Sequence, residues 1–411
     1  MKINSVLIIV IACLFFVSAC TDLNLPADPQ PVRELNDHEK QLAEADNVFS
    51  LKLFREVNNV ESEKDIFISP LSVSFALGMT LNGAAEETYQ AIRRTLEFDN
   101  LDPDEINATY KSLIEYLTKI DPKVAVQIAN SIWYREGFSV KDEFLKTNQF
   151  YFNAEIAALN FADPDAVVTI NNWVDNNTNG KITRIVDTIN DEIVMLLINA
   201  VYFKGDWMYE FDPEDTFDGS FYLPDGSTEI CRMMPQENTF DYFSNDSFQA
   251  VDLPYGNSAY SMTVFLPAEE ADINQIIKQM DGTAWENWIN GLSQKKGRLV
   301  LPKFKKEYDI NLNDILKTLG MEVAFNAGVA DFSNINETAE LFISKVTHKT
   351  FIEVDEKGTE AAAVTAVEVG VTSVDPDYFV MEVNRPFFFV IREKHSGTIL
   401  FMGKILNPNN K

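Results

Sequence analysis

The feature that most constrains the fold is an unbroken body that runs from Asn47 to the end of the chain. No linker, repeat or low-complexity tract interrupts it. The chain has 411 residues, of which 46% are hydrophobic, so it can bury a large core. We therefore predict one large domain over residues 46–411 rather than two smaller ones.

The pattern within this body is mixed α and β. Ser69-Pro70 followed by the apolar run 71–81 predicts a buried helix with a serine cap. The apolar, β-rich run 193–203 predicts a strand covered on both faces. The runs 387–391 and 399–405 flank a polar turn and predict a closing hairpin. No parallel β-α-β rhythm appears, so the fold class is α+β.

The charge balance excludes whole classes of partner. The chain has 34 Lys and Arg against 63 Asp and Glu, a formal net charge of −29 at pH 7. Such an excess of acid repels phosphate backbones and anionic lipid. We expect no nucleic-acid partner and no basic membrane-binding patch, whereas cationic partners are allowed.

Residues that usually hold metals or perform covalent catalysis are scarce. Cys231 is the single cysteine of the body, and His38, His348 and His395 are far apart in sequence. No HExxH or GxSxG pattern is present. We predict no metal site, no cofactor and no enzymatic activity.

The N-terminal segment resembles an export signal. Lys2 precedes the apolar run 6–17, and Val17-Ser18-Ala19-Cys20 resembles the lipobox of bacterial lipoproteins. We expect residues 1–19 to be removed and Cys20 to carry a lipid. The alternative is an ordinary signal peptide in which Cys20 has no role.

The next segment contains Pro26, Pro29 and Pro31 among polar residues and reads as a flexible tether over residues 20–45. The expected location is the bacterial cell envelope, with the body held by the lipid on the periplasmic or outer face, or released from the cell. The membrane is then a partner only through that lipid.

A second unusual segment follows the short strand pattern Phe351-Ile352-Glu353-Val354. Residues 359–371 alternate between two faces and carry little bulk at first. One face holds Thr359, Ala361, Ala363, Thr365, Val367, Val369 and Val371, and none of these is charged. Pattern alone is equally compatible with an edge strand or an Ala-rich loop.

The string Glu356-Lys357-Gly358-Thr359-Glu360-Ala361-Ala362-Ala363 closely resembles the hinge of inhibitory serpins. Further serpin-like strings occur in the family's order over about residues 47–408. They are Phe67-Ile68-Ser69-Pro70-Leu71-Ser72, Asn172-Trp173-Val174, Thr178-Asn179-Gly180-Lys181-Ile182, Asn199-Ala200-Val201-Tyr202-Phe203-Lys204-Gly205-Asp206-Trp207, Leu301-Pro302-Lys303-Phe304, Asn384-Arg385-Pro386-Phe387 and Phe401-Met402-Gly403-Lys404.

The resemblance implies a serpin fold with three β-sheets, about nine helices and an exposed, mobile reactive-centre loop at about residues 356–383. It also implies a suicide-substrate inhibitor. A protease cleaves the loop, and insertion of the loop into the main sheet traps the acyl-enzyme. The alternative on the same fold is a non-inhibitory binding or chaperone-like protein. We expect a monomer.

Counting the family's 17 residues from Glu356 places the reactive bond between Thr372 and Ser373, with Val371 as the alternative. Residues 358–384 contain no Lys or Arg, so proteases that require a basic residue find nothing to cut. Small β-branched residues suit elastase-like or subtilisin-like proteases, and some papain-like cysteine proteases.

The resemblance also assigns roles beneath the main sheet. Four residues match the positions whose polar network controls strand separation: Ser69, Ser72, Asn199 and His348. Trp207 matches the tryptophan at the point where insertion begins. For His348 and Trp207 the simpler interpretation is that of ordinary core residues.

Overall fold

The structure, a computed structural model, describes residues 33–359 and 377–410. Residues from Glu34 onward belong to one compact unit. The expected signal segment 1–19 and Cys20 lie outside the described residues. So do seven residues of the expected hinge and reactive bond: Glu360, Ala361, Ala362, Ala363, Val371, Thr372 and Ser373.

Strands in the described residues form two hydrogen-bonded sheets. The six-stranded sheet has the order β10-β11-β12-β4-β2-β3. Its strands are β10 (Phe304–Asn311), β11 (Thr347–Val354), β12 (Gly358–Thr359), β4 (Met195–Asp206), β2 (Val124–Arg135) and β3 (Glu155–Leu159).

The nine-stranded sheet has the order β1-β15-β14-β8-β7-β6-β9-β13, and β5 pairs with β6. The bounds are β1 (Ile66–Ile68), β15 (Ile399–Ile405), β14 (Phe387–Glu393), β8 (Tyr260–Pro267), β7 (Phe248–Tyr255), β6 (Thr228–Ser244), β9 (Ser293–Pro302), β13 (Phe379–Glu382) and β5 (Phe217–Tyr222).

The number of sheets differs from the expected three, although the α+β architecture is confirmed. The 17-residue strand β6 is the reason. It pairs with β5 through residues 228–233, with β9 through residues 233–242, and with β7 through residues 241–244. The strands that the family resemblance assigns to two separate sheets are therefore joined by hydrogen bonds into one sheet.

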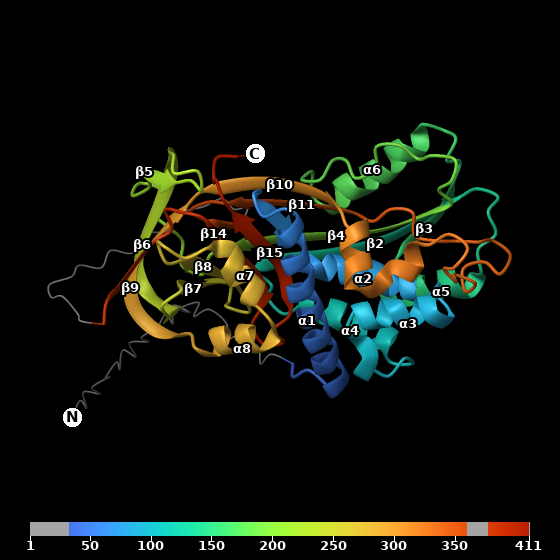
Figure 1. The fold of residues 1–411 in the computed structure, drawn as a ribbon, viewed down its shortest axis with the longest axis horizontal. Coiled ribbons are helices and arrows are strands. Elements are labelled where there is room, and N and C mark those ends of the chain that lie inside the picture. Colours follow the sequence, from blue (N-terminus) through green and yellow to red (C-terminus); the bar gives the residue numbers. More distant parts are fainter. Residues whose placement is uncertain (1–32, 360–376, 411) are drawn as a thin grey trace, which may run out of the picture. The chain divides into compact units, whose positions relative to one another are not determined.

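The described residues also form nine α-helices (Figure 1). They are α1 (Asp37–Val60), α2 (Pro70–Leu81), α3 (Glu86–Thr95), α4 (Ile106–Leu117), α5 (Asp142–Phe152), α6 (Asp165–Asn177), α7 (Ile273–Gln279), α8 (Gly282–Asn290) and α9 (Asn313–Leu316). Three short 3-10 or π segments accompany them: Phe98–Asn100, Lys317–Met321 and Glu322–Phe325.

The start of α1 corrects the expected tether, which extended to residue 45. The backbone N–H of Glu39 donates to the side chain of Asn36 at 2.9 Å, and the N–H of Asn36 donates to the Glu39 carboxylate at 2.8 Å. This reciprocal cap fixes the helix start at Asp37. Most of the polar residues taken for a tether lie on the exposed side of this helix, whereas Leu42, Phe49 and also Glu39 are buried.

Three predicted elements are confirmed. The buried helix is α2, with Pro70 in its first turn and the Ser69 side chain accepting from the N–H of Ser72. The closing hairpin is β14 and β15, whose residues are all buried. The central strand is β4, which begins two residues later than the predicted run.

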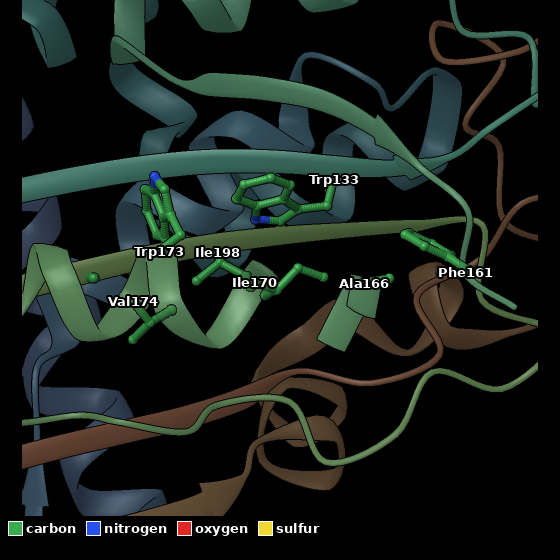
Figure 2. Packing of buried hydrophobic residues seen from close by; sticks show 8 residues of the cluster. Trp133, Phe161, Ala166, Ile170, Trp173, Val174 and Ile198 are labelled. Atoms are coloured by element: carbon green, nitrogen blue, oxygen red, sulfur yellow. The ribbon is translucent and has the colours of Figure 1, made fainter. Parts of the chain in front are cut away.

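Strand β4 is covered by helices on both faces, as its apolar sequence predicts. Helix α2 packs on one face, and α6 packs on the other across β2 and β4. Figure 2 shows this second layer, in which Trp133 of β2 and Ile198 of β4 meet Ile170 and Trp173 of α6. The indole rings of Trp133 and Trp173 lie edge to face, with centroids 6.1 Å apart.

Candidate functional site

The expected hinge begins as a strand of the six-stranded sheet. Gly358 and Thr359 form β12 between β11 and β4. Thr359 pairs with Val354 on one side and with Gly205 on the other, both in antiparallel orientation. The first residues of the hinge, up to Thr359, therefore already form part of the six-stranded sheet.

Gly358 is required by the close approach of β4. A Cβ atom at this position would lie 2.2 Å from the carbonyl oxygen of Gly205 and 2.7 Å from the Cα atom of Asp206. Both are backbone atoms and cannot rotate away. No other residue fits without displacing β4.

Glu356 anchors the chain just before β12. Its carboxylate accepts from Lys303 Nζ at 2.6 Å and from Thr216 Oγ1 at 2.8 Å. Its carbonyl accepts from the N–H of Phe211 at 2.8 Å. Burial raises the pKa of Glu356, but the hydrogen bonds from Lys303 and Thr216 outweigh it and hold the pKa below its ordinary value.

Trp207 holds the other side of the hinge. Its backbone N–H donates to the carbonyl of Lys357 at 2.7 Å, and its indole N–H donates to that of Asp355 at 3.0 Å. The indole stacks on Tyr255 with ring centroids 4.4 Å apart. The Tyr255 hydroxyl lies 2.8 Å from Thr359 Oγ1. Trp207 thus holds Asp355 and Lys357 directly and reaches Thr359 through Tyr255.

Beyond Thr359 the inner edges of β4 and β11 face each other without a strand between them in the described residues. Each strand is paired on its outer side, β4 with β2 and β11 with β10. A cavity lined by Tyr202, Phe203, Ile352 and Thr359 lies at this position. Within the described parts of the chain, no strand pairs with these two inner edges directly ahead of β12.

A polar network lies further along β4 from the hinge, where α2 packs against the six-stranded sheet. The N–H of Ser69 donates to Nε2 of His348 at 2.9 Å, and Ser69 Oγ donates to the carbonyl of Leu400 at 2.9 Å. Ser72 Oγ reaches the carbonyl of Asn199 at 3.5 Å. The network links α2 to β11 and β4, the two strands that flank β12.

His348 is neutral in this environment. Its side chain accepts a hydrogen bond at Nε2 and is buried. Burial lowers the pKa of His348 from 6.5 to about 4. The contact to Ser69 requires an unprotonated Nε2, so protonation breaks the link between α2 and β11.

The structure thus brings two groups of sequence-predicted residues together. Glu356, Gly358, Thr359 and Trp207 meet at one end of β4, and Ser69, Ser72, Asn199 and His348 meet further along it.

A family model described as serpin (serine protease inhibitor) matches residues 44–408. The chain belongs to the serpin family.

Curated serpins align with this chain over most of its length. Human neuroserpin is 34% identical over 370 residues, which is 87% of this chain and 90% of that protein. Mouse leukocyte elastase inhibitor A is 32% identical over 381 residues, covering 90% of this chain and 100% of its own length.

Solved serpin structures confirm the fold. The thermophilic serpin tengpin in its native state has a TM-score of 0.82 at 33% identity, covering 93% of this chain and 97% of its own. Human thyroxine-binding globulin complexed with its hormone has a TM-score of 0.83 at 27% identity, covering 91% and 100%. The fold is therefore shared by serpins named for different functions.

Sequence reasoning missed several residues of this serpin's hinge. Tyr255, Lys303 and Thr216 form hydrogen bonds with hinge residues. Asn130 was also missed; it belongs to the polar network, where its side chain accepts a hydrogen bond from Asn199 Nδ2 at 2.7 Å. Lys303 belongs to the serpin-like string Leu301-Pro302-Lys303-Phe304, but nothing in that string indicates that the lysine pairs with a carboxylate. Contacts across more than fifty positions leave no signal in one sequence.

No helix in the described parts of the chain is long and apolar enough to cross a membrane.

The neutral His348 makes stability depend on pH. An unfolded histidine binds a proton below about pH 6.5, whereas folded His348 resists protonation until about pH 4. The unfolded state is therefore favoured as the pH falls, and the free energy of unfolding decreases by about 2 kcal/mol by pH 5.

We predict that His348→Gln removes this part of the decrease in the free energy of unfolding between pH 7.5 and 5, as measured by urea unfolding. An identical pH dependence in wild type and variant would contradict it.

Proposed function

We propose that this serpin is a suicide-substrate inhibitor of serine proteases. The single observation that carries the proposal is β12, because the hinge already pairs with β4 and β11 on both sides. Insertion after cleavage then only extends an existing strand. The chain supplies no catalytic group; the bond-breaking chemistry belongs to the protease.

The register of β12 defines what insertion would place together. Extending the pairing of Thr359 with Gly205 one residue at a time sets Ala361 opposite Phe203, Ala363 opposite Val201 and Thr365 opposite Asn199. On the other side, the pairing with Val354 sets Thr365 opposite His348. Thr365 would then enter the polar network between its two strands.

Side-chain size supports insertion in this register. Directly opposed residues of antiparallel strands point to the same face. Ala361, Ala363 and Thr365 therefore share a face with Phe203 and other odd-numbered residues of β4. Small or uncharged side chains can be buried there, whereas a single unpaired charge would cost several kcal/mol.

The bait would be the bond between Thr372 and Ser373, or the one after Val371. The protease serine attacks the carbonyl carbon of Thr372, the amine of Ser373 leaves with a proton, and an acyl ester remains. Insertion of the new strand would carry that ester away before water attacks it. Elastase-like or subtilisin-like proteases fit the small residues, and papain-like cysteine proteases fit Val371. One relative is named for elastase inhibition.

The experiment mixes the body from residue 34 onward with an elastase and, separately, with trypsin. We predict a covalent complex with elastase that survives denaturing electrophoresis, with cleavage after Thr372 or Val371. Trypsin should form no complex through the loop, since residues 358–384 lack Lys and Arg. Clean cleavage by elastase without a complex would instead favour a non-inhibitory binding protein, a role compatible with the resemblance to thyroxine-binding globulin.

Ala363→Arg tests the insertion step in the same assay. The arginine would lie opposite Val201 on the buried face, so insertion slows and the protease completes hydrolysis. We predict a change from inhibitor to substrate, with at least tenfold less complex per loop cleaved. Glu368→Arg is the matched control, because that position lies on the other face and already carries a charge. Equal complex formation by both variants would refute the proposed register.

We also propose that Cys20 carries a lipid that holds the protein at the bacterial envelope. The proposal rests on the Val17-Ser18-Ala19-Cys20 string and on the start of α1 at Asp37, which limits the spacer to residues 20–36.

Cys20→Ser should move the protein from the membrane fraction to the soluble fraction of the expressing cells, as measured by fractionation and immunoblotting. Substitution of Cys231, which is buried in the body, is the control and should change nothing. Persistent membrane association of Cys20→Ser would contradict the lipid assignment.

A further inference from the structure

A carboxyl group lies in the core, between three helices. Asp46 of α1 is 2% exposed, and one of its oxygens accepts a hydrogen bond from Ser74 Oγ of α2 at 2.6 Å. Ser74 Oγ in turn lies 2.7 Å from the hydroxyl of Tyr110 on α4. The other carboxyl oxygen of Asp46 is buried, and no group of the described residues forms a hydrogen bond with it.

The surroundings of this carboxyl group are apolar and closely packed. Tyr110 is fully buried, and its ring contacts those of Phe75, Phe98 and Phe152, with centroids 5.2 to 5.8 Å apart. A Cβ atom on Gly78 would lie 2.7 Å from the same tyrosine ring, so α2 and α4 approach each other closely. An ionised carboxylate is strongly disfavoured in such a place unless a cation pairs with it.

The titratable groups nearest to Asp46 come from α1 and α4. Glu39 lies two turns earlier on α1, and Tyr110 reaches Asp46 through Ser74. Other elements bring charged side chains to α1 further along the helix, where Glu97 bonds to Lys52 and Lys404 of β15 bonds to Asn58.

No cation offsets the cost of ionising Asp46. Within residues 33–359 and 377–410, no Lys, Arg or His changes its pKa through a charge interaction. Burial raises the pKa of Asp46 from 3.8 to about 7, although the hydrogen bond from Ser74 lowers it. The packing and the single hydrogen bond therefore favour the neutral acid.

Asp46 and His348 hold the same helix through its first turns. Ser69, the cap of α2, donates its N–H to His348, and Ser74 of α2 donates its hydroxyl to Asp46. Both partners are buried and neutral, but they respond to pH in opposite ways. His348 becomes charged when it gains a proton, whereas Asp46 becomes charged when it loses one.

We propose that Asp46 holds a proton in the folded protein at mildly acidic pH, and that Asp46 and His348 form a compensating pair. Together they keep the hold on α2, and with it the stability of the body, nearly constant between about pH 5 and 6. This inference concerns folding and requires no protease.

The two groups couple folding to pH with opposite signs. The unfolded chain gains a proton at His348 below about pH 6.5, whereas folded His348 resists protonation until about pH 4, so this group destabilises the fold as the pH falls. Folded Asp46 gains its proton near pH 7, whereas in the unfolded chain its pKa is 3.8. Asp46 therefore stabilises the fold as the pH falls, and this contribution is lost as the pH rises to about 7.

Urea unfolding between pH 6 and 5 separates the two contributions. Each group changes the unfolding equilibrium constant about tenfold per pH unit, in opposite directions. On lowering the pH from 6 to 5, that constant should rise about tenfold more in Asp46→Asn than in the wild type, because His348 is no longer compensated. It should rise about tenfold less in His348→Gln, and the double variant should follow the wild type.

Glu44→Gln is the matched control, because it makes the same carboxyl-to-amide change at an exposed position of α1. Its unfolding should follow the wild type at every pH. The remaining carboxyl groups contribute equally to all of these proteins, so only differences from the wild type are compared.

Infrared spectroscopy gives a second measurement, which does not depend on the folding of Asp46→Asn. The wild type at pH 6 should show the band of a protonated carboxyl group, and this band should disappear as the pH is raised to 8.5. Glu44→Gln should keep the band, and a folded Asp46→Asn should lack it.

Equal pH dependence of unfolding in Asp46→Asn and the wild type would show that Asp46 is ionised, and would overturn the proposal. A wild type without the protonated carboxyl band at pH 6 would overturn it as well. A protein that traps no protease would refute the proposed function but would leave both of these measurements unaffected.

Discussion

The structure depends on the pairing of Gly358 and Thr359 between β4 and β11. This two-residue strand closes the sheet at one end and leaves the inner edges of both neighbours without a partner ahead of it, in the part of the chain that the structure describes. Glu356 and Trp207 fix where it starts, through Lys303, Thr216 and the carbonyl groups of the hinge. Among the described residues the hinge thus contributes a two-residue strand, which gives its continuation a defined starting point between β4 and β11.

Insertion is a balance between large opposing terms. Each new backbone hydrogen bond contributes about 0.5 to 1.5 kcal/mol, whereas ordering each residue costs roughly 1 to 2 kcal/mol. These terms nearly cancel, so burial of side chains decides the direction, at about 25 cal/mol per Å² of apolar surface. The small residues proposed for the inserted face would allow that burial, and the polar network around His348 links α2 to the two strands that would separate.

Much of this arrangement could be predicted from the sequence, and the rest could not for identifiable reasons. Local patterns predicted α2, β4 and the closing hairpin, because caps and apolar runs act over a few residues. The capping box of Asn36 and Glu39 was missed because its polar residues resemble a tether. The contact between Tyr255 and Thr359, and the ion pair between Lys303 and Glu356, join distant parts of the chain, and only the fold brings them together.

Hydrogen exchange before and after loop cleavage tests the incomplete sheet most directly. Backbone amides of β4 and β11 should exchange measurably in the intact protein, because beyond β12 no strand of the described residues pairs with their inner edges. After cleavage by elastase, exchange in peptides that cover Met195–Asp206 and Thr347–Val354 should slow strongly, while peptides from β7 and β8 should change little. Unchanged exchange in β4 and β11 after cleavage would show that no strand enters between them, and would contradict the insertion mechanism.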